Sequence, residues 1–182
     1  MTPLSEAASE GYAEVVRLLI ATGQVDVNSK ACGGRTPLSK ATGDRLPLSG
    51  GTSEDYEAVV KLLLATGQVD IDSKDSDGCT PLTWAASDGS EEVVRLLLAT
   101  GQVDMNSKDF YGCTPLLWAA SEGQEAVVKQ LLATGQVDIN SKDSSGCTPL
   151  SKAASGGHEG VVKLLLETGR VDVGLPRSHT IV

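Results

Sequence analysis

The feature that most constrains this chain is a hexapeptide that occurs four times without change. "ATGQVD" stands at residues 21–26, 65–70, 99–104 and 133–138, and a fifth copy at 167–172 reads "ETGRVD". The tripeptide "TPL" recurs as well, beginning at Thr2, Thr36, Thr80, Thr114 and Thr148. Its spacings are therefore 34, 44, 34 and 34 residues. Self-similarity at this period is typical of a solenoid, in which every stacked unit needs the same joint.

The period divides the chain into five units and a tail. The predicted boundaries are 1–30, 31–74, 75–108, 109–142 and 143–173 for the units, and 174–182 for the C-terminal tail. Residues 1–173 are therefore interpreted as one array. The second unit is ten residues longer than the third and fourth, because 44 residues rather than 34 separate its "TPL" from the next one.

The fourth unit shows how one repeat is expected to fold. Thr114 suits the N-cap of a short helix, and Pro115 suits its first position, where no N–H is needed. A second helix is predicted to begin at Glu125 and to end at Gly135, which can take the left-handed conformation of a helix terminus. Gly112 permits a tight hairpin between units. Each helix is only about two turns long, so it must be stabilised by the copies before and after it.

The unit "GCTPLLWAASEGQEAVVKQLLATGQVDIN" resembles the ankyrin repeat throughout its length, and the resemblance covers about 173 of the 182 residues. It implies an all-α ankyrin-repeat solenoid, a curved stack with a concave groove. It also implies a non-catalytic scaffold that binds a partner protein through its hairpin tips and concave face. The 34-residue variant is similar to arrays of filamentous fungi that are often part of larger NACHT-type receptors. The sequence departs from the family where a histidine commonly follows "TPL", with Ser5, Ser39, Thr83, Leu117 and Ser151 in its place.

Charge and composition limit the classes of partner. The formal net charge of −9 argues against DNA, RNA and anionic membranes, which carry the same sign. No apolar run approaches the roughly 20 residues of a membrane span, and the N-terminus has no signal-peptide pattern. We therefore expect an intracellular protein, cytoplasmic or nuclear and not secreted, whose partner is another protein.

The hairpin tips are the most variable part of the repeat and the first candidate contact surface. Phe110 and Tyr111 form an aromatic pair at one tip, and Ser76 and Asp77 occupy another. Exposed aromatic side chains are frequent anchors of protein interfaces. The alternative is that Phe110 folds down onto its neighbours.

The ends of the first helices form a second candidate surface. Asp88, Ser121 and Glu122 belong to a ladder of serines and acids that an array would align along its groove. This ladder could form an acidic groove for a basic or polar segment, or simply a row of solvated helix ends. Trp84 and Trp118 lie inside the same helices, and we expect them to be buried between units with the indole N–H bonded. An aromatic patch in the groove is the alternative.

The ten-residue excess falls within residues 43–54, between the two helices of the second unit. Its glycines, proline and serines predict a loop rather than a helix. Leu46 and Leu48 would give this loop an apolar tip that contributes to partner choice, and a neutral insertion is the alternative. Deletion of residues 43–52 restores the 34-residue period and is expected to leave the fold intact or slightly stabilised.

The sequence shows no pattern of a catalytic or metal site. Cys79, Cys113 and Cys147 lie in register one layer apart, too far for disulfides, so free thiols are expected. Neither zinc nor calcium spacing is present, and no cofactor motif is found. An enzyme with an unrecognised site is the least favoured alternative.

The ends of the array raise a further possibility. A solenoid needs polar caps, and the apolar second helix of the fifth unit resembles an interior copy. The chain could therefore be part of a larger protein, or it could self-associate through an uncapped end. The apolar residues of that helix are Val161, Val162, Leu164, Leu165 and Leu166.

Overall fold

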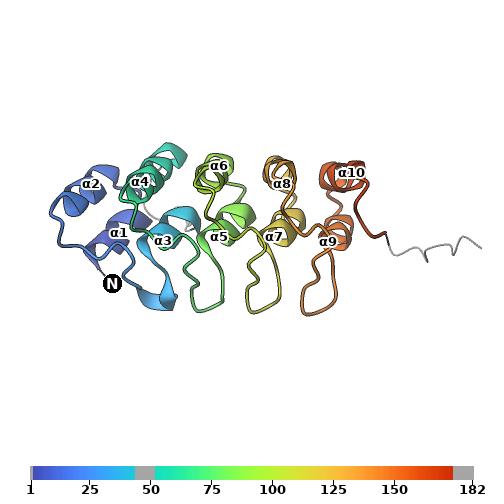
Figure 1. Cartoon of the computed structure of the whole chain (residues 1–182), viewed down its shortest axis with the longest axis horizontal. Helices are drawn as coiled ribbons and strands as arrows, with labels where there is room; N and C mark the ends of the chain where they lie inside the picture. The colour runs from blue at the N-terminus through green and yellow to red at the C-terminus, as the bar shows by residue number, and fades with distance from the viewer. Residues whose placement is uncertain (1, 44–51, 174–182) are drawn as a thin grey trace, which may run out of the picture.

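A computed structural model of the chain describes residues 2–43 and 52–173. In these residues it contains ten α-helices, one 3-10 helix (η1, Cys32–Gly34) and no strand. The helices form two rows, with the hairpin loops projecting beyond the row of first helices (Figure 1). The first helices are α1 (Pro3–Ser9), α3 (Pro37–Gly43), α5 (Pro81–Asp88), α7 (Pro115–Ser121) and α9 (Pro149–Ser155). The second helices are α2 (Ala13–Ala21), α4 (Ser53–Ala65), α6 (Glu91–Ala99), α8 (Glu125–Ala133) and α10 (Glu159–Glu167). The predicted all-α solenoid is confirmed.

Local sequence sets both ends of each helix pair. In the fourth unit Thr114 caps α7, because its Oγ1 accepts from the Leu117 N–H at 3.3 Å. At the end of α8, the Thr134 hydroxyl donates to the Leu131 carbonyl at 2.6 Å and accepts from the following backbone at 3.3 Å. Gly135 then takes a φ of 70°. "TPL" and "ATG" are therefore the start and stop signals of the helix pair.

The remainder of the hexapeptide is held by the preceding unit, which the sequence alone does not reveal. Asn106 donates its amide Nδ2 to the Gln136 carbonyl at 3.0 Å and accepts from the Asp138 N–H at 2.8 Å. Asn28 and Asn140 bridge their following units in the same way. In these three places one asparagine side chain satisfies both backbone groups of the following joint, whereas Asp72, at the same position of the second unit, accepts from the Asp104 N–H.

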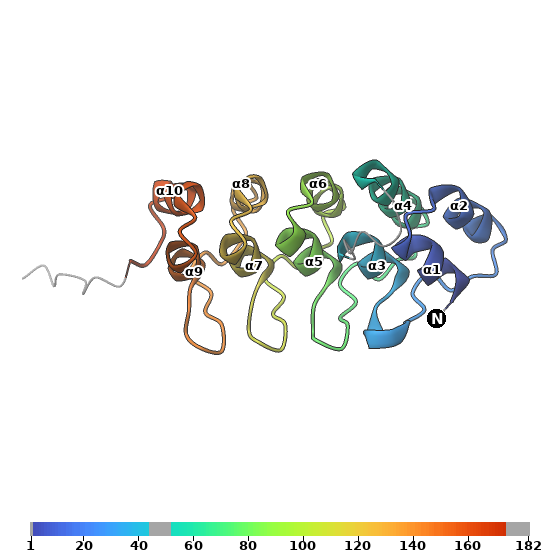
Figure 2. The same cartoon turned by 180° about the vertical axis from the view of Figure 1, so that it is seen from behind.

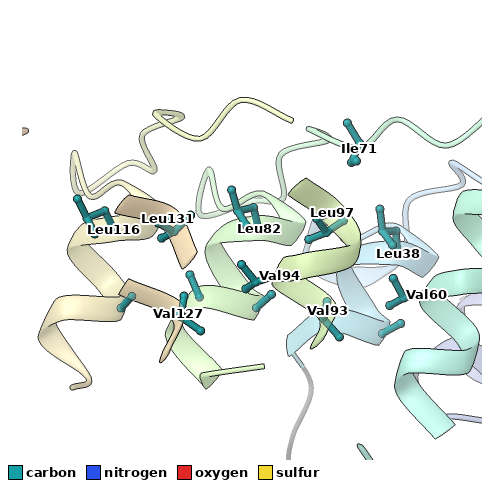
Figure 3. Close-up of a cluster of buried hydrophobic side chains, with 14 of the residues drawn as sticks. Leu38, Val60, Ile71, Leu82, Val93, Val94, Leu97, Leu116, Val127 and Leu131 are labelled. Carbon is teal, nitrogen blue, oxygen red and sulfur yellow. The ribbon is translucent and has the colours of Figure 1, made fainter. Parts of the chain in front are cut away.

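The apolar core runs through the stack as a repeated layer between the two rows of helices (Figure 3). Leu82 and Leu116 of the first helices and Val94 and Leu131 of the second helices are at most 1% exposed. Consecutive first helices contact each other, and so do consecutive second helices. Each short helix is thereby covered by its neighbours, as the repeat pattern predicts.

The second unit departs from the sequence prediction. Its second helix, α4, has 13 residues instead of nine and already begins at Ser53. Thr52 and Asp55 form a capping box, in which Asp55 accepts from the Thr52 N–H at 2.8 Å. The prediction of a loop over 43–54 is therefore wrong at both ends of that range, since Gly43 also belongs to α3. Leu46 and Leu48 lie outside the described residues.

The two tryptophans are half-buried and do not belong to the apolar core cluster. Trp84 packs on the preceding unit as predicted, since a Cβ built on Gly43 would lie 2.4 Å from the Trp84 Cβ. The prediction that the indole N–H is bonded is also right, because Trp84 donates to Asp75 and Trp118 donates to Asp109. Most of each tryptophan is covered, and the part that is not covered lies beside the polar base of the hairpin, where the indole bonds to the aspartate.

No helix in the described residues is both long and apolar enough to cross a membrane.

Candidate partner-binding surface

Backbone hydrogen bonds join successive hairpin tips into one continuous edge. The N–H of Ser76 donates to the Gly33 carbonyl at 2.8 Å, and the N–H of Phe110 donates to the Asp77 carbonyl at 3.0 Å. The N–H of Ser144 donates to the Tyr111 carbonyl at 2.8 Å. The loops accordingly lie side by side along the stack (Figure 2). Each tip is thus fixed by its neighbours, which reduces the entropy lost when a partner binds.

In the third and fourth units a buried aspartate at the base of the hairpin holds the loop rigid. Asp109 is 6% exposed, and its Oδ1 accepts from the N–H groups of Tyr111 at 2.9 Å and Cys113 at 2.8 Å. Its Oδ2 accepts from the Trp118 Nε1 at 2.8 Å. Asp75 makes the equivalent bonds in the third unit. The tryptophan therefore ties its own hairpin to the first helix.

The fifth unit keeps this arrangement with a different residue. Lys152 occupies the tryptophan position, and its Nζ lies 3.2 Å from the Asp143 Oδ2. The bond to Asp143 raises the pKa of Lys152, and the Cys147 N–H together with Lys152 lowers the pKa of Asp143. The Asp143 carboxylate is therefore ionised at neutral pH and accepts the hydrogen bonds of its hairpin.

A row of lysines adds a second link between hairpins. The Nζ of Lys30 donates to the Lys74 carbonyl at 2.8 Å, Lys74 donates to Lys108 at 2.8 Å, and Lys108 donates to Lys142 at 2.9 Å. These side chains, whose register is visible in the sequence, therefore hold the backbone of the next unit as well as carrying surface charge.

The aromatic pair lies on this rigid edge and faces solvent. Phe110 is 75% exposed and Tyr111 is 60% exposed. Phe110 also lies across the preceding tip, since a Cβ built on Gly78 would approach its Cδ1 to 2.9 Å. Exposure of Phe110 and its packing onto a neighbour are alternatives in the sequence analysis. In the structure, Phe110 both faces solvent and contacts the preceding tip.

Comparison with known families agrees with this geometry. A profile described as "Ankyrin repeats (3 copies)" matches residues 51–143 and 127–179, and one described as "Ankyrin repeat" matches residues 1–31. The chain belongs to the ankyrin repeat family. Residues 32–50, which lie outside these matches, contain most of the extra residues of the second unit. A search of curated proteins finds no match to this chain.

The other predicted contact residues of the ankyrin array fall into two groups. Ser76 and Asp77 are exposed at the tip next to Phe110. Asp88 and Ser121 are half-buried and Glu122 is exposed, all at the far ends of the first helices. The structure therefore brings the tip residues together and leaves the helix-end residues apart from them.

The serines of the helix-end ladder have a structural role. The carbonyl of Ser121 lies 2.8 Å from His158 Nε2, and the carbonyl of Ser87 accepts from Gln124 Nε2 at 3.0 Å. Each turn residue thus caps the first helix of the preceding unit. This favours the view of these positions as joints between units, with Glu122 facing solvent and Asp88 half-buried.

The cysteines of the array are free thiols. Burial, assisted by the charges of Asp75 and Asp109, raises the pKa of Cys79 to about 12, and burial raises that of Cys113 to about 11. Both thiols are therefore protonated at neutral pH, which makes them poor nucleophiles. The described residues contain no cluster of three or more groups that could hold a metal ion.

Proposed function

We propose that the chain is a non-catalytic ankyrin module that binds a partner protein along its hairpin tips, with Phe110 and Tyr111 as the central anchors. Ankyrin repeats are protein-interaction modules. The observation that carries the proposal is the exposure of two adjacent aromatic side chains on a backbone that is bonded to the tips on both sides. Large aromatic side chains are typical of binding hot spots, and a rigid backbone lowers the conformational entropy that is lost when a partner binds.

Charge indicates the chemistry of the partner. The tip beside the aromatic pair carries exposed Asp77, and the whole chain carries a net charge of −9. A partner segment that combines apolar side chains with lysine or arginine complements this surface, because opposite potentials steer association. This composition also distinguishes the expected partner from nucleic acids.

The test begins by isolating partners with the wild-type chain as bait and repeating the capture with Phe110→Ser/Tyr111→Ser. A partner lost from the variant is then purified, and its affinity for both chains is measured by calorimetry. We expect the double substitution to weaken binding by at least about a hundredfold, as expected for two hot-spot side chains.

The matched control is Ser144→Ala/Ser145→Ala on the following tip, where both side chains are exposed and small. It should leave the affinity within about twofold. Circular dichroism establishes that both variants remain folded. If the aromatic variant binds every purified partner as well as the wild type does, the tip proposal is wrong.

Two further parts of the proposal concern what surrounds the array. One is that it acts as a regulatory segment within a larger multidomain receptor, by analogy with the arrays that it resembles. The other is self-association through the uncapped ends of the stack. Leu166 on α10 is 47% exposed, whereas Val161 and Leu165 of the same helix are buried, so only part of that helix is open.

A further inference from the structure

The N-terminal end of the stack exposes apolar side chains at positions that are covered elsewhere. On α2, Val15 is 45% exposed. The valines at the same position of the later second helices are at most 4% exposed, and they are Val59, Val93, Val127 and Val161. Leu18 is 56% exposed and Tyr12, just before α2, is 53% exposed. These three residues, Tyr12, Val15 and Leu18, define the head face.

The opposite end exposes the complementary half of the same interface. Leu150 and Val162 are half-buried and Ala154 is exposed. The residues at these three positions in the third and fourth units are buried, and they are Leu82, Leu116, Ala86, Ala120, Val94 and Val128. Two hollows open here, one of about 420 Å³ lined by Leu150 and Ala154, and one of about 340 Å³ lined by Ala154 and Val162. Leu150, Ala154, Val162 and Leu166 define the tail face.

We propose that the head face of one copy stacks on the tail face of a second copy, in the register of the contacts between units inside the chain. This inference rests on the self-association part of the proposed function and is independent of the partner surface at the hairpin tips. Such a contact is heterologous, because two different faces meet, so it adds copies in a line instead of closing a dimer. The interface between consecutive second helices, which is repeated from α2 to α10, is the template.

A specific polar contact supports this register. Tyr56 precedes Val59 by three residues, as Tyr12 precedes Val15. The Tyr56 hydroxyl donates to the carbonyl of Ser9, at the end of the preceding first helix, over 3.2 Å. In the stacked pair, Tyr12 takes the position of Tyr56, and the carbonyl of Ser155 takes the position of Ser9. The tyrosine of the head face therefore has an acceptor on the tail face.

The charges also match an internal contact. Within the chain, Lys61 lies 3.9 Å from Glu57 on α4 and 3.7 Å from Glu92 on α6. At the tail face, Lys163 lies 4.0 Å from Glu159, in the same arrangement as Lys61 and Glu57. At the head face, Glu14 directly precedes Val15, just as Glu92 directly precedes Val93. Stacking therefore completes the same triad of one lysine and two glutamates between copies.

The experiment measures the mass of the full chain by sedimentation equilibrium over a wide concentration range. The wild type should increase in mass with concentration without stopping at a dimer. Leu18→Glu on the head face and Leu166→Glu on the tail face should each weaken self-association on the order of a hundredfold, because each buries an unpaired carboxylate in the contact. Both positions are exposed within one chain, so both variants should retain the wild-type thermal midpoint.

Mixing the two variants decides between the head-to-tail contact and other modes. Each variant keeps one intact face, so an equimolar mixture should form a dimer and nothing larger. A dimer that persists in one variant alone would show that like faces meet, and the inference would be overturned. A wild-type chain that stays monomeric at all concentrations would also overturn it, along with the self-association part of the proposed function. Phe110→Ser/Tyr111→Ser should leave the assembly unchanged, so the tip proposal is judged separately.

Discussion

The second and fourth units build the same hairpin with different side chains. In the fourth unit, Asp109 accepts from two backbone N–H groups and from Trp118. The second unit has Ala31 at this position, but the turn bonds remain, with Ala31 N donating to the Arg35 carbonyl at 2.8 Å and Gly34 N donating to the Ala31 carbonyl at 3.0 Å. The backbone geometry is therefore maintained in one unit by a buried carboxylate and in the other without one.

In the second unit, Gly33, Gly34 and Arg35 stabilise the hairpin in place of the carboxylate. Gly33 and Gly34 both have positive φ, of 75° and 70°, so this tip reaches a conformation that few other residues adopt. Arg35 donates to the Ser39 carbonyl, and its guanidinium lies 4.5 Å from the centre of the Trp84 ring. The difference shows that a repeat can lose its consensus side chain at one position when other residues hold the same backbone.

The largest effect is expected from removing the carboxylate of the fourth unit. Asp109→Ala leaves the buried N–H of Cys113, the part-buried N–H of Tyr111 and the Trp118 indole without their acceptor, so the free energy of unfolding should fall by about 3 kcal/mol. Urea titration measures this change. The matched control is Ala31→Ser, which should change stability by less than about 0.5 kcal/mol. Equal effects at the two positions would show that the hairpins do not differ in what holds them.

The next largest effect concerns the length of the second unit. Deletion of residues 43–52 removes the Thr52 cap and places Asp55 where units one, three, four and five have Gly11, Gly89, Gly123 and Gly157 at positive φ. We expect a loss of about 2 kcal/mol, from the cap and from a left-handed aspartate. This corrects the expectation that the deletion is harmless.

The same deletion combined with Asp55→Gly should recover about half of that loss, since it recreates the sequence Glu-Gly-Tyr found at Glu10, Gly11 and Tyr12. Thermal unfolding of the two deletion variants makes the comparison. If both variants unfold at the same temperature, the left-handed position is not what distinguishes the second unit.

A smaller effect is expected at Tyr56, which stands at the position of Gln124 in the fourth unit and bonds to the first helix of the preceding unit. Tyr56→Phe removes the bond to the Ser9 carbonyl and should cost about 1 kcal/mol. Gln124→Ala, which removes the equivalent bond to the Ser87 carbonyl in the fourth unit, should cost a similar amount. Denaturant melts of both variants test the equivalence. A much larger loss for Tyr56→Phe would mean that its hydroxyl does more than cap a helix.

The smallest effect concerns Asp72, which stands where the fourth unit has Asn140. Asp72 accepts from the Asp104 N–H at 3.1 Å, but its ionised carboxylate has no N–H to donate as Asn140 does to the Arg170 carbonyl. Asp72→Asn should therefore stabilise the chain by about 0.5–1 kcal/mol at neutral pH, and Asn140→Asp should destabilise it by a similar amount.

The gain from Asp72→Asn should depend on pH. Burial raises the pKa of Asp72 above its ordinary value, and the Asp104 and Asp70 charges add to this effect. An acid whose pKa is raised by folding destabilises the fold when ionised, and this cost disappears below its unfolded pKa of about 3.9. The advantage of the variant should thus be largest at pH 7 and shrink towards pH 3. A gain that is constant with pH would show that ionisation of Asp72 plays no part.

The repeat period and the start and stop signals of the helices can be predicted from the sequence alone. Thr114 caps a helix and Gly135 ends the next one through contacts within a few residues, so their roles can be predicted without a structure. The sequence also assigned Phe110 and Tyr111 to a hairpin tip, but it left open whether Phe110 faces solvent or folds down onto its neighbours, and the structure shows it 75% exposed.

Only the tertiary structure decided which side chains connect one unit to the next. Asn106 contacts Gln136 across 30 residues, and Tyr56 contacts Ser9 across 47, distances along the chain at which local patterns carry no information. The start of α4 at Ser53, by contrast, depends on a capping box between Thr52 and Asp55, a local signal that the alignment by period overlooked. Val15 of the head face lies in the same local sequence, Glu-Val-Val-Arg-Leu-Leu, as the buried Val93, and it is exposed because no described unit packs against that side of α2. Burial is a property of the neighbours in space, so identical residues in identical local sequences acquire different roles.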